Sequence, residues 1–249
     1  TFIAPIKFAI DLLAVLLLAL GIKGLSKVRS AREANRLAAI AMLLAAFGVL
    51  MNSQGTIGIS INSWVWIISG TLIGGLLGAI TAKKVPMTAM PEIVALFNGC
   101  GGMSSLLVAL GVALFPSSEG SDEVASELVR NFSIVVSLFV GAITFSGSIV
   151  AMAKLQGWLS TPSWTQSKAR HFFNILCAAI ALIGGIYLSI DGQNGLFLIV
   201  VASSLLGIGV TLPIGGADMP VVISLLNSYS GVAAAAAGFV VGSQLLIVA

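Results

Sequence analysis

Two asparagines at matched positions in a repeated motif are the residues of this chain best suited to chemistry. Residues 90–102 align without a gap with residues 219–231, and the Met, Pro, Leu, Asn and Gly positions agree. Asn98 and Asn227 each lie seven residues after the proline of their copy. An amide cannot take up and release a proton at ordinary pH, but it can orient water or hold a neighbouring titratable group.

Small and polar residues share a helical face with each asparagine. The helical period places Asn98 with Gly101, Gly102 and Ser105, and Asn227 with Ser224, Ser230, Gly231 and Ala234. Polar residues inside a membrane usually face a bundle interior or a water-filled path. Asparagine also joins membrane helices by plain hydrogen bonds, so this alternative stays open.

The composition requires these helices to lie in lipid. Of the 249 residues, 58% are hydrophobic and only 8% are charged, whereas soluble domains carry about 25% charged residues. The apolar runs are continuous and near twenty residues long, which is typical of membrane helices and not of barrel strands. We predict an all-α, polytopic transmembrane helix bundle. The basic residues lie in short clusters between the runs, so the high pI does not indicate nucleic-acid binding.

Eight apolar segments are long enough to cross about 30 Å of hydrocarbon. They run roughly over residues 2–22, 36–52, 61–82, 90–115, 128–153, 170–190, 194–212 and 218–241. Ten of the twelve basic residues fall in the first, third and fifth loops. The positive-inside rule then places these loops in the cytoplasm and the N-terminus outside. Residues 243–249 begin another apolar run, so we expect a ninth span that is truncated here.

Other features of the sequence carry weaker expectations. The ladder Gly70, Gly74 and Gly78 predicts close helix packing. Hydroxyls within the fifth span, Thr144, Ser146 and Ser148, are expected to bond back to their own helix. No nucleophile motif, metal-ligand cluster or phosphate loop is present, so we expect no catalytic, cofactor-binding or metal-ligating residue in this chain.

Several blocks of the sequence resemble one membrane protein family. Residues 215–222 (GGADMPVV) and 226–231 (LNSYSG) are similar to the β subunit of proton-translocating NAD(P) transhydrogenase. Residues 82–92, 141–148 and 154–155 resemble it too, so the likeness covers nearly the whole chain. The resemblance implies nine spans followed by a cytoplasmic NADP(H)-binding domain. Residues 1–249 would then be the transmembrane proton-translocating domain, without that C-terminal domain.

The resemblance also implies an activity and partners. In the family, hydride passes from NADH, held by the α subunit, to NADP, held by the β-subunit domain missing here, and proton flow drives the reaction. This chain alone would conduct protons and bind neither NAD(H) nor NADP(H). Its partners would be the α-subunit membrane helices, the NAD(H)-binding domain, its own NADP(H)-binding domain and lipid, with no nucleic acid. We expect a dimer of complexes in the bacterial cytoplasmic (inner) membrane.

Site residues follow from the resemblance position by position. Many members carry a proton-carrying histidine where this chain has Asn98, whereas the one histidine here, His171, lies at the edge of a span. The resemblance therefore implies that Asn98 and Asn227 line the path and that a partner chain brings the titrating group. We add the small polar neighbours Ser105, Ser224 and Ser230 to the path. Candidates for the cytoplasmic mouth, where the nucleotide domain couples, are Asp218, Glu92, Tyr229 and His171.

Two other functions remain as alternatives. A secondary transporter would build a midplane solute site from the repeat, with helices broken at mid-span. The prolines of this repeat lie at helix ends, which counts against it. A passive membrane anchor would tolerate Leu or Ala at both asparagines.

Overall fold

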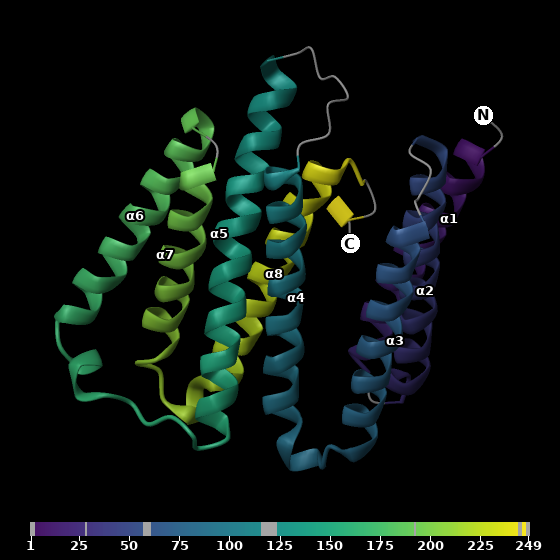
Figure 1. The fold of residues 1–249 in the computed structure, drawn as a ribbon. Coiled ribbons are helices and arrows are strands. Elements are labelled where there is room, and N and C mark those ends of the chain that lie inside the picture. The colour runs from purple at the N-terminus through teal and green to yellow at the C-terminus, as the bar shows by residue number, and fades with distance from the viewer. Residues whose placement is uncertain are drawn as a thin grey trace. The chain divides into compact units, whose positions relative to one another are not determined.

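The structure is a computed structural model that describes residues 3–27, 29–56, 61–115, 124–191, 193–243 and 246–247. Eight long helices cover most of this part of the chain (Figure 1). They are α1 (Ile3–Leu25), α2 (Ala31–Thr56), α3 (Ile61–Lys84), α4 (Met90–Leu114), α5 (Val124–Leu155), α6 (Ala169–Asp191), α7 (Gln193–Thr211) and α8 (Met219–Val241). All eight are long and apolar enough to cross a membrane. The predicted all-α transmembrane bundle is thereby confirmed, with each helix close to its expected bounds.

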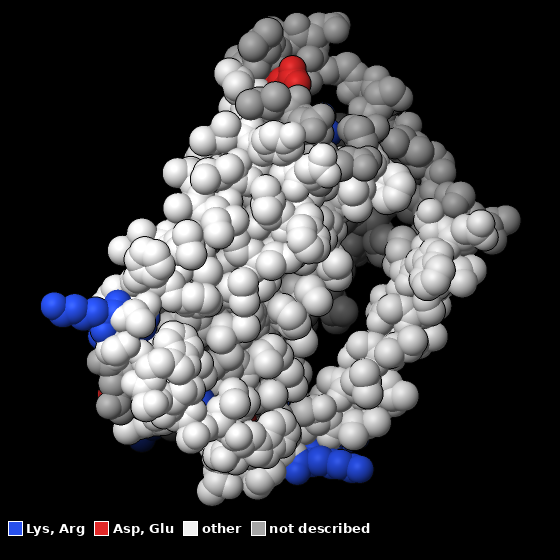
Figure 2. All heavy atoms as spheres, turned by 60° about the vertical axis from the view of Figure 1, so that its left-hand side comes forward, with Lys and Arg blue, Asp and Glu red and all other residues white. Residues whose placement is uncertain are grey.

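The exterior of the molecule is suited to lipid. Phe132, Phe172 and Phe197 are each at least 70% exposed, which a water-facing surface would not tolerate in such number. Figure 2 shows a face that is almost wholly uncharged, with its few charged groups mostly toward the rims. Hydrocarbon accepts these side chains at no cost, so the burial of apolar area in water does not hold this bundle together.

The chain divides into two compact units, Thr1–Lys84 with Val248–Ala249, and Val85–Ile247. In the first unit, α1 and α2 pack together as a hairpin, and Gly21 and Gly24 of α1 lie against Ala34 of α2.

The glycines of α3 do not make such contacts among the described residues of this unit. A Cβ built on Gly70, Gly74, Gly75 or Gly78 would meet no described atom within 4 Å. The close packing predicted from this ladder is therefore not formed within the described part of the first unit.

The second unit is organised around α5. This helix packs against α4, α7 and α8, while α6 packs mainly on α7 (Figure 1). Leu138 and Ala142 of α5 and Ile199 of α7 are fully buried between these helices. Helix α5 is the most buried of the eight helices, because 61% of its apolar stretch, Glu127–Leu155, is buried. It is therefore the element most able to hold polar groups away from lipid.

Helices α4 and α8 begin with the same backbone turn. Each follows a short 3₁₀ helix, η1 (Met87–Ala89) before α4 and η3 (Gly216–Asp218) before α8. The residues that precede these turns, Pro86 (φ −70°, ψ 154°) and Gly215 (φ −69°, ψ 155°), have nearly identical backbone angles. A proline then occupies the first turn of each α-helix, where its missing N–H costs nothing. The helix starts predicted at the two prolines are confirmed, and the structural repeat extends back into segments with little sequence similarity.

Candidate functional site

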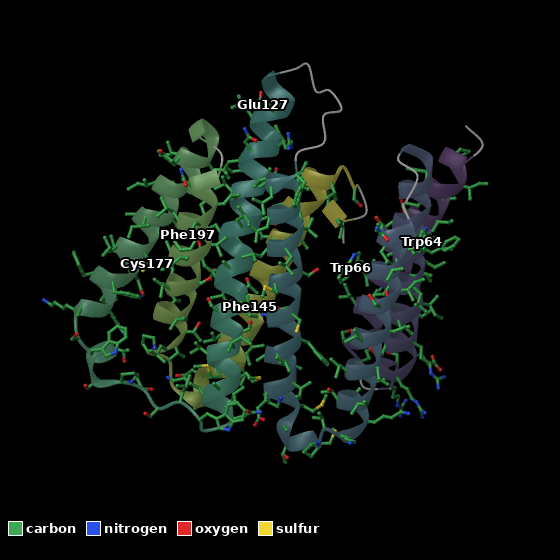
Figure 3. The ribbon with its side chains drawn as sticks, viewed as in Figure 1. Trp64, Trp66, Glu127, Phe145, Cys177 and Phe197 are labelled. Atoms are coloured by element: carbon green, nitrogen blue, oxygen red, sulfur yellow. The ribbon has the colours of Figure 1, made fainter. Side chains whose placement is uncertain are left out.

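A stripe of hydroxyl groups runs along the buried face of α5. Ser133, Ser137, Gly141, Thr144 and Ser148 are spaced by four, four, three and four residues, which keeps them on one face of a helix. The four hydroxyl residues are at most 5% exposed. Phe145, labelled in Figure 3, follows Thr144 and marks the level of this stripe on α5.

Helix α4 presents a matching stripe to α5. A Cβ on Gly102 would lie 2.9 Å from the carbonyl oxygen of Gly141, and a Cβ on Gly141 would lie 2.9 Å from that of Gly102. Small residues allow membrane helices to approach this closely. Asn98 and Ser105 flank Gly102 on α4 and are buried, at 8% and 7% exposure. We call the facing residues the α4/α5 seam: Asn98, Gly102 and Ser105 on α4, and Ser137, Gly141, Thr144 and Ser148 on α5.

Hydrogen bonds cross the seam at both ends. The Asn98 Nδ2 amide donates to Ser148 Oγ at 3.0 Å. Eleven residues earlier on α5, Ser137 Oγ lies 3.1 Å from the carbonyl oxygen of Ser105 on α4 and 3.2 Å from that of Ala233 on α8. Ser105 Oγ itself donates to the Gly101 carbonyl at 3.3 Å. The seam therefore joins three helices through neutral polar groups.

Two buried polar atoms of the seam have no hydrogen-bond partner among the described residues. They are Asn98 Oδ1 and Thr144 Oγ1. An unpaired buried group costs about 1–3 kcal/mol, and in native proteins such groups are generally satisfied by protein or by ordered water. The seam thus offers an acceptor on α4 and a hydroxyl on α5, the latter one helical turn from the Ser148 that Asn98 binds. Each can bind a water molecule or a polar group from elsewhere.

The second asparagine stripe lies in different surroundings. Asn227 and Ser224 are exposed on α8, away from its packing against α4 and α5. Ser230 is half-buried, and its Oγ lies 3.0 Å from the position of a Cβ on Gly101 of α4. The structure therefore brings Ser230 to the edge of the α4 stripe. It leaves Asn227 on an outer face, so the two asparagines match in sequence but not in environment.

The candidates for the cytoplasmic mouth separate into three places. Asp218 is exposed at the start of α8, and Glu92 is half-buried in the first turn of α4. His171 is exposed near the start of α6, where its Nε2 accepts a hydrogen bond from Arg170 Nε at 3.2 Å. Tyr229 lies eleven residues after Asp218, about 16 Å further along α8 at 1.5 Å per residue. Tyr229 therefore lies beside Ser230 in the chain, and its place at the cytoplasmic mouth stays a prediction.

The hydroxyls of α5 divide into two kinds that the sequence did not separate. Ser146 Oγ bonds back to the Ala142 carbonyl at 2.9 Å, as expected. The expectation was wrong for Ser148, which binds Asn98 across the seam, and Thr144 Oγ1 makes no such bond. The signal that could have found the stripe is the spacing of Ser133, Ser137, Thr144 and Ser148 itself. Within the described ranges, no group of three or more His, Cys, Asp or Glu side chains could hold a metal ion.

Comparisons with known proteins identify the family. The family model described as NAD(P) transhydrogenase beta subunit matches residues 7–249. The NAD(P) transhydrogenase subunit beta of Rhodospirillum rubrum is 37% identical over 247 residues, which cover 98% of this chain and 52% of that relative. The same subunit from one named strain of that species gives the same figures. The chain spans about half the length of the curated relatives it matches. A helical membrane chain matched by this model along nearly its whole length belongs to the NAD(P) transhydrogenase beta subunit family.

Proposed function

We propose that residues 1–249 form the proton-conducting membrane domain of a transhydrogenase, in which inward proton flow drives hydride transfer from NADH to NADP. The observation that carries the proposal is the α4/α5 seam, where Asn98 and Thr144 hold unpaired buried polar atoms. In a membrane protein of this family, such atoms are where water or a hydronium ion would be bound. NAD(H) and NADP(H) would be held outside this chain's membrane helices, by the partner and by the rest of the subunit.

The seam is long enough to form a large part of a path. Ser137 and Ser148 are eleven residues apart on α5, about 16 Å of a hydrocarbon layer of about 30 Å. Its hydroxyls and amide can form a chain of hydrogen bonds with bound water, but none of them gains or loses a proton near neutral pH. The group that accepts and releases the proton must therefore come from outside the seam. The family resemblance supports a histidine on a membrane helix of the α subunit.

The exposed polar face of α8 supports a partner helix at this place. Asn227 and Ser224 lie on this face with Ser228, whose Oγ bonds only to its own helix, to the Ser224 carbonyl at 3.2 Å. An amide facing lipid is costly, and polar residues of membrane helices almost always face protein or water. We infer that a membrane helix of the assembled complex covers Asn227, and that Asn227, Ser224 and Ser230 line the path from that side.

The ends of α4 and α8 that carry Glu92 and Asp218 would face the cytoplasm. In the second unit, the last turn of α5, which carries Lys154, and the start of α6, with Lys168 and Arg170 beside it, lie toward this same end (Figure 1). This placement of basic residues supports the orientation by the positive-inside rule. Asp218 would then contact the NADP(H)-binding domain, and the N-terminus would lie outside a bacterial inner membrane. We also propose that two complexes associate as a dimer.

The energy of one proton is sufficient for this coupling. A proton crossing 100 mV releases about 2.3 kcal/mol. At about 1.4 kcal/mol per decade this could shift a docking equilibrium of the nucleotide domain nearly fifty-fold. No observation on this chain favours a midplane solute site or a passive anchor over this function.

The test uses the complete complex in sealed proteoliposomes. Nucleotide turnover should change the internal pH, reported by a trapped pH-sensitive dye. A protonophore should abolish the pH change while hydride transfer continues. Hydride transfer at full rate without any change in internal pH would refute the proposed function, and uptake of a solute by the β subunit alone would favour the transporter.

Ser148→Ala is expected to lower the coupled rate of hydride transfer by roughly threefold to tenfold. The substitution removes one buried hydrogen bond, worth about 0.5–1.5 kcal/mol, and leaves the Asn98 amide unpaired. Ser146→Ala is the matched control, because Ser146 is also buried on α5 but bonds only within its own helix. Steady-state rates of the two variants should differ. Equal rates would show that the seam bond has no part in turnover.

A further inference from the structure

A buried lysine joins the end of α5 to the segment that connects α7 to α8. Lys154 is only 8% exposed. Its Nζ ammonium donates to the carbonyl oxygen of Leu212, to that of Ile214 at 2.6 Å, and to Thr161 Oγ1 at 2.8 Å. An ammonium has three protons to donate, so these three oxygens use them all.

The three partners are neutral oxygens, and their position explains how they can hold a charge. Helix α7 ends at Thr211, so the carbonyls of Leu212 and Ile214 lie just beyond its C-terminus. The last carbonyls of a helix lack partners within it, and the negative end of the helix dipole favours a cation there. Burying an ammonium is costly unless every proton is bonded. Lys154 therefore acts as a C-terminal cap for α7 that is supplied by a different helix.

The clamped segment leads directly into the start of α8. Ile214 is followed by Gly215, whose carbonyl accepts a hydrogen bond from the Asp218 N–H at 3.1 Å in the η3 turn. Met219, the next residue, is fully buried against Ala151 of α5 and its neighbours. The position of Asp218 is thus set within a few residues of the lysine clamp.

The other end of this link is the α4/α5 seam. Lys154 lies six residues after Ser148 on α5, about 9 Å along one continuous helix. Gly157, in a left-handed conformation at φ 73°, closes α5 just after the lysine, and the Trp158 N–H bonds back to the Ala153 carbonyl at 2.9 Å. The last turn of α5 is therefore well fixed when it presents the ammonium.

We propose that Lys154 is a positioning residue for coupling: its ammonium, bound to the Leu212 and Ile214 carbonyls and to Thr161, holds the start of α8 in a fixed relation to the seam. The inference rests on the proposed function, because it gives the seam a rigid connection to Asp218 at the cytoplasmic mouth. The lysine touches neither substrate nor proton path. It acts only through the backbone of residues 212–214.

The first test measures the position of the η3 turn without any turnover. Met219→Cys, a fully buried position directly after η3, is introduced into the complete complex with Cys100 and Cys177 replaced by Ala. Its rate of reaction with a water-soluble maleimide is then followed. Lys154→Met keeps the apolar stem but removes the ammonium. It should raise the labelling rate about tenfold or more, because each hydrogen bond to a charged group changes an equilibrium constant by about a factor of ten or more. Lys168→Met, at an exposed lysine on the same end of the unit, should leave the rate unchanged.

The second test measures coupling in proteoliposomes as protons translocated per hydride transferred. Lys154→Met should lower this ratio at least about threefold in assembled enzyme, whereas Lys154→Arg, which retains a cation with several donors, should restore most of it. If the lysine had a merely structural role, Lys154→Met would lower thermal stability and leave the number of protons translocated per hydride unchanged in the assembled enzyme. If Lys154→Met does not assemble, Thr161→Val removes one partner of the ammonium and should give an intermediate rise in labelling.

The outcomes separate the two claims. The positioning role would be overturned if Lys154→Met showed the wild-type labelling rate and the wild-type ratio of protons to hydride. If Lys154→Met does not assemble, the same result in Thr161→Val would overturn it. A wild-type complex that moves no protons would overturn the proposed function. The labelling comparison would still decide whether the lysine holds the turn.

Discussion

Gly102→Val is expected to lower the free energy of unfolding of the assembled protein by about 1–3 kcal/mol, the usual cost of overpacking a close contact. A Cβ at this position would lie 2.9 Å from the Gly141 carbonyl oxygen, the Phe145 nitrogen and the Thr144 Cβ. Two of these three atoms are backbone, so they cannot turn aside as a flexible side chain would. Helices α4 and α5 must move apart, and the bond between Asn98 and Ser148 would be lost with the contact.

Gly111→Val is the matched control for this prediction. Gly111 lies on the same helix, yet a Cβ there would meet no described atom within 4 Å. The apparent thermal midpoint of the purified complex in mild detergent should fall for Gly102→Val and stay near the wild-type value for Gly111→Val. Equal midpoints for the two variants would mean that the close approach of α4 and α5 does not limit stability.

Asn98→Leu should lower the rate of coupled hydride transfer by about 10-fold to 100-fold. Leucine has the same number and branching of side-chain heavy atoms as asparagine, so it fits this position with limited repacking. The change removes the donor to Ser148 Oγ and the unpaired Oδ1 acceptor together. A water molecule or hydronium ion in the seam would then lose a polar partner worth about 1–3 kcal/mol, which corresponds to the stated range.

This rate should be compared with a hydride exchange that needs no proton to cross the membrane. Asn98→Leu should leave such an exchange near its wild-type rate, because the proposed function places both nucleotides outside the membrane helices. Asn98→Gln offers a second comparison, since it keeps the amide but displaces it by one methylene. A full coupled rate in Asn98→Leu would exclude the amide from the path.

The eight spans and the family were predictable from the sequence because both depend on local information. Lipid demands about twenty consecutive apolar residues, and the short basic clusters mark the ends. The helix starts at Pro91 and Pro220 were predictable for the same reason. The matching turns before them were not, because residues 86–89 and 215–218 have little sequence in common and share only backbone angles.

The partners of each helix face were less predictable, because a sequence shows which residues share a face but not what covers it. Asn98 and Asn227 occupy equal places in the repeat, yet one is buried against α5 and the other is exposed on α8. The glycine ladder of α3 meets no described atom of its own unit. A close approach is instead made by Gly102 and Gly141, which lie on different helices. Only the folded chain shows that these two glycines meet.

The measurement that tests the central claim most directly is the initial rate of proton translocation in proteoliposomes containing wild-type, Ser146→Ala or Asn98→Leu complex. A fall in hydride transfer alone could arise from a misplaced nucleotide domain, whereas proton movement reports on the membrane path itself. We predict that wild-type and Ser146→Ala complexes translocate protons at similar rates and that Asn98→Leu retains about a tenth or less, matching its loss of one buried polar partner. Proton translocation by Asn98→Leu at the wild-type rate would contradict a path along the α4/α5 seam.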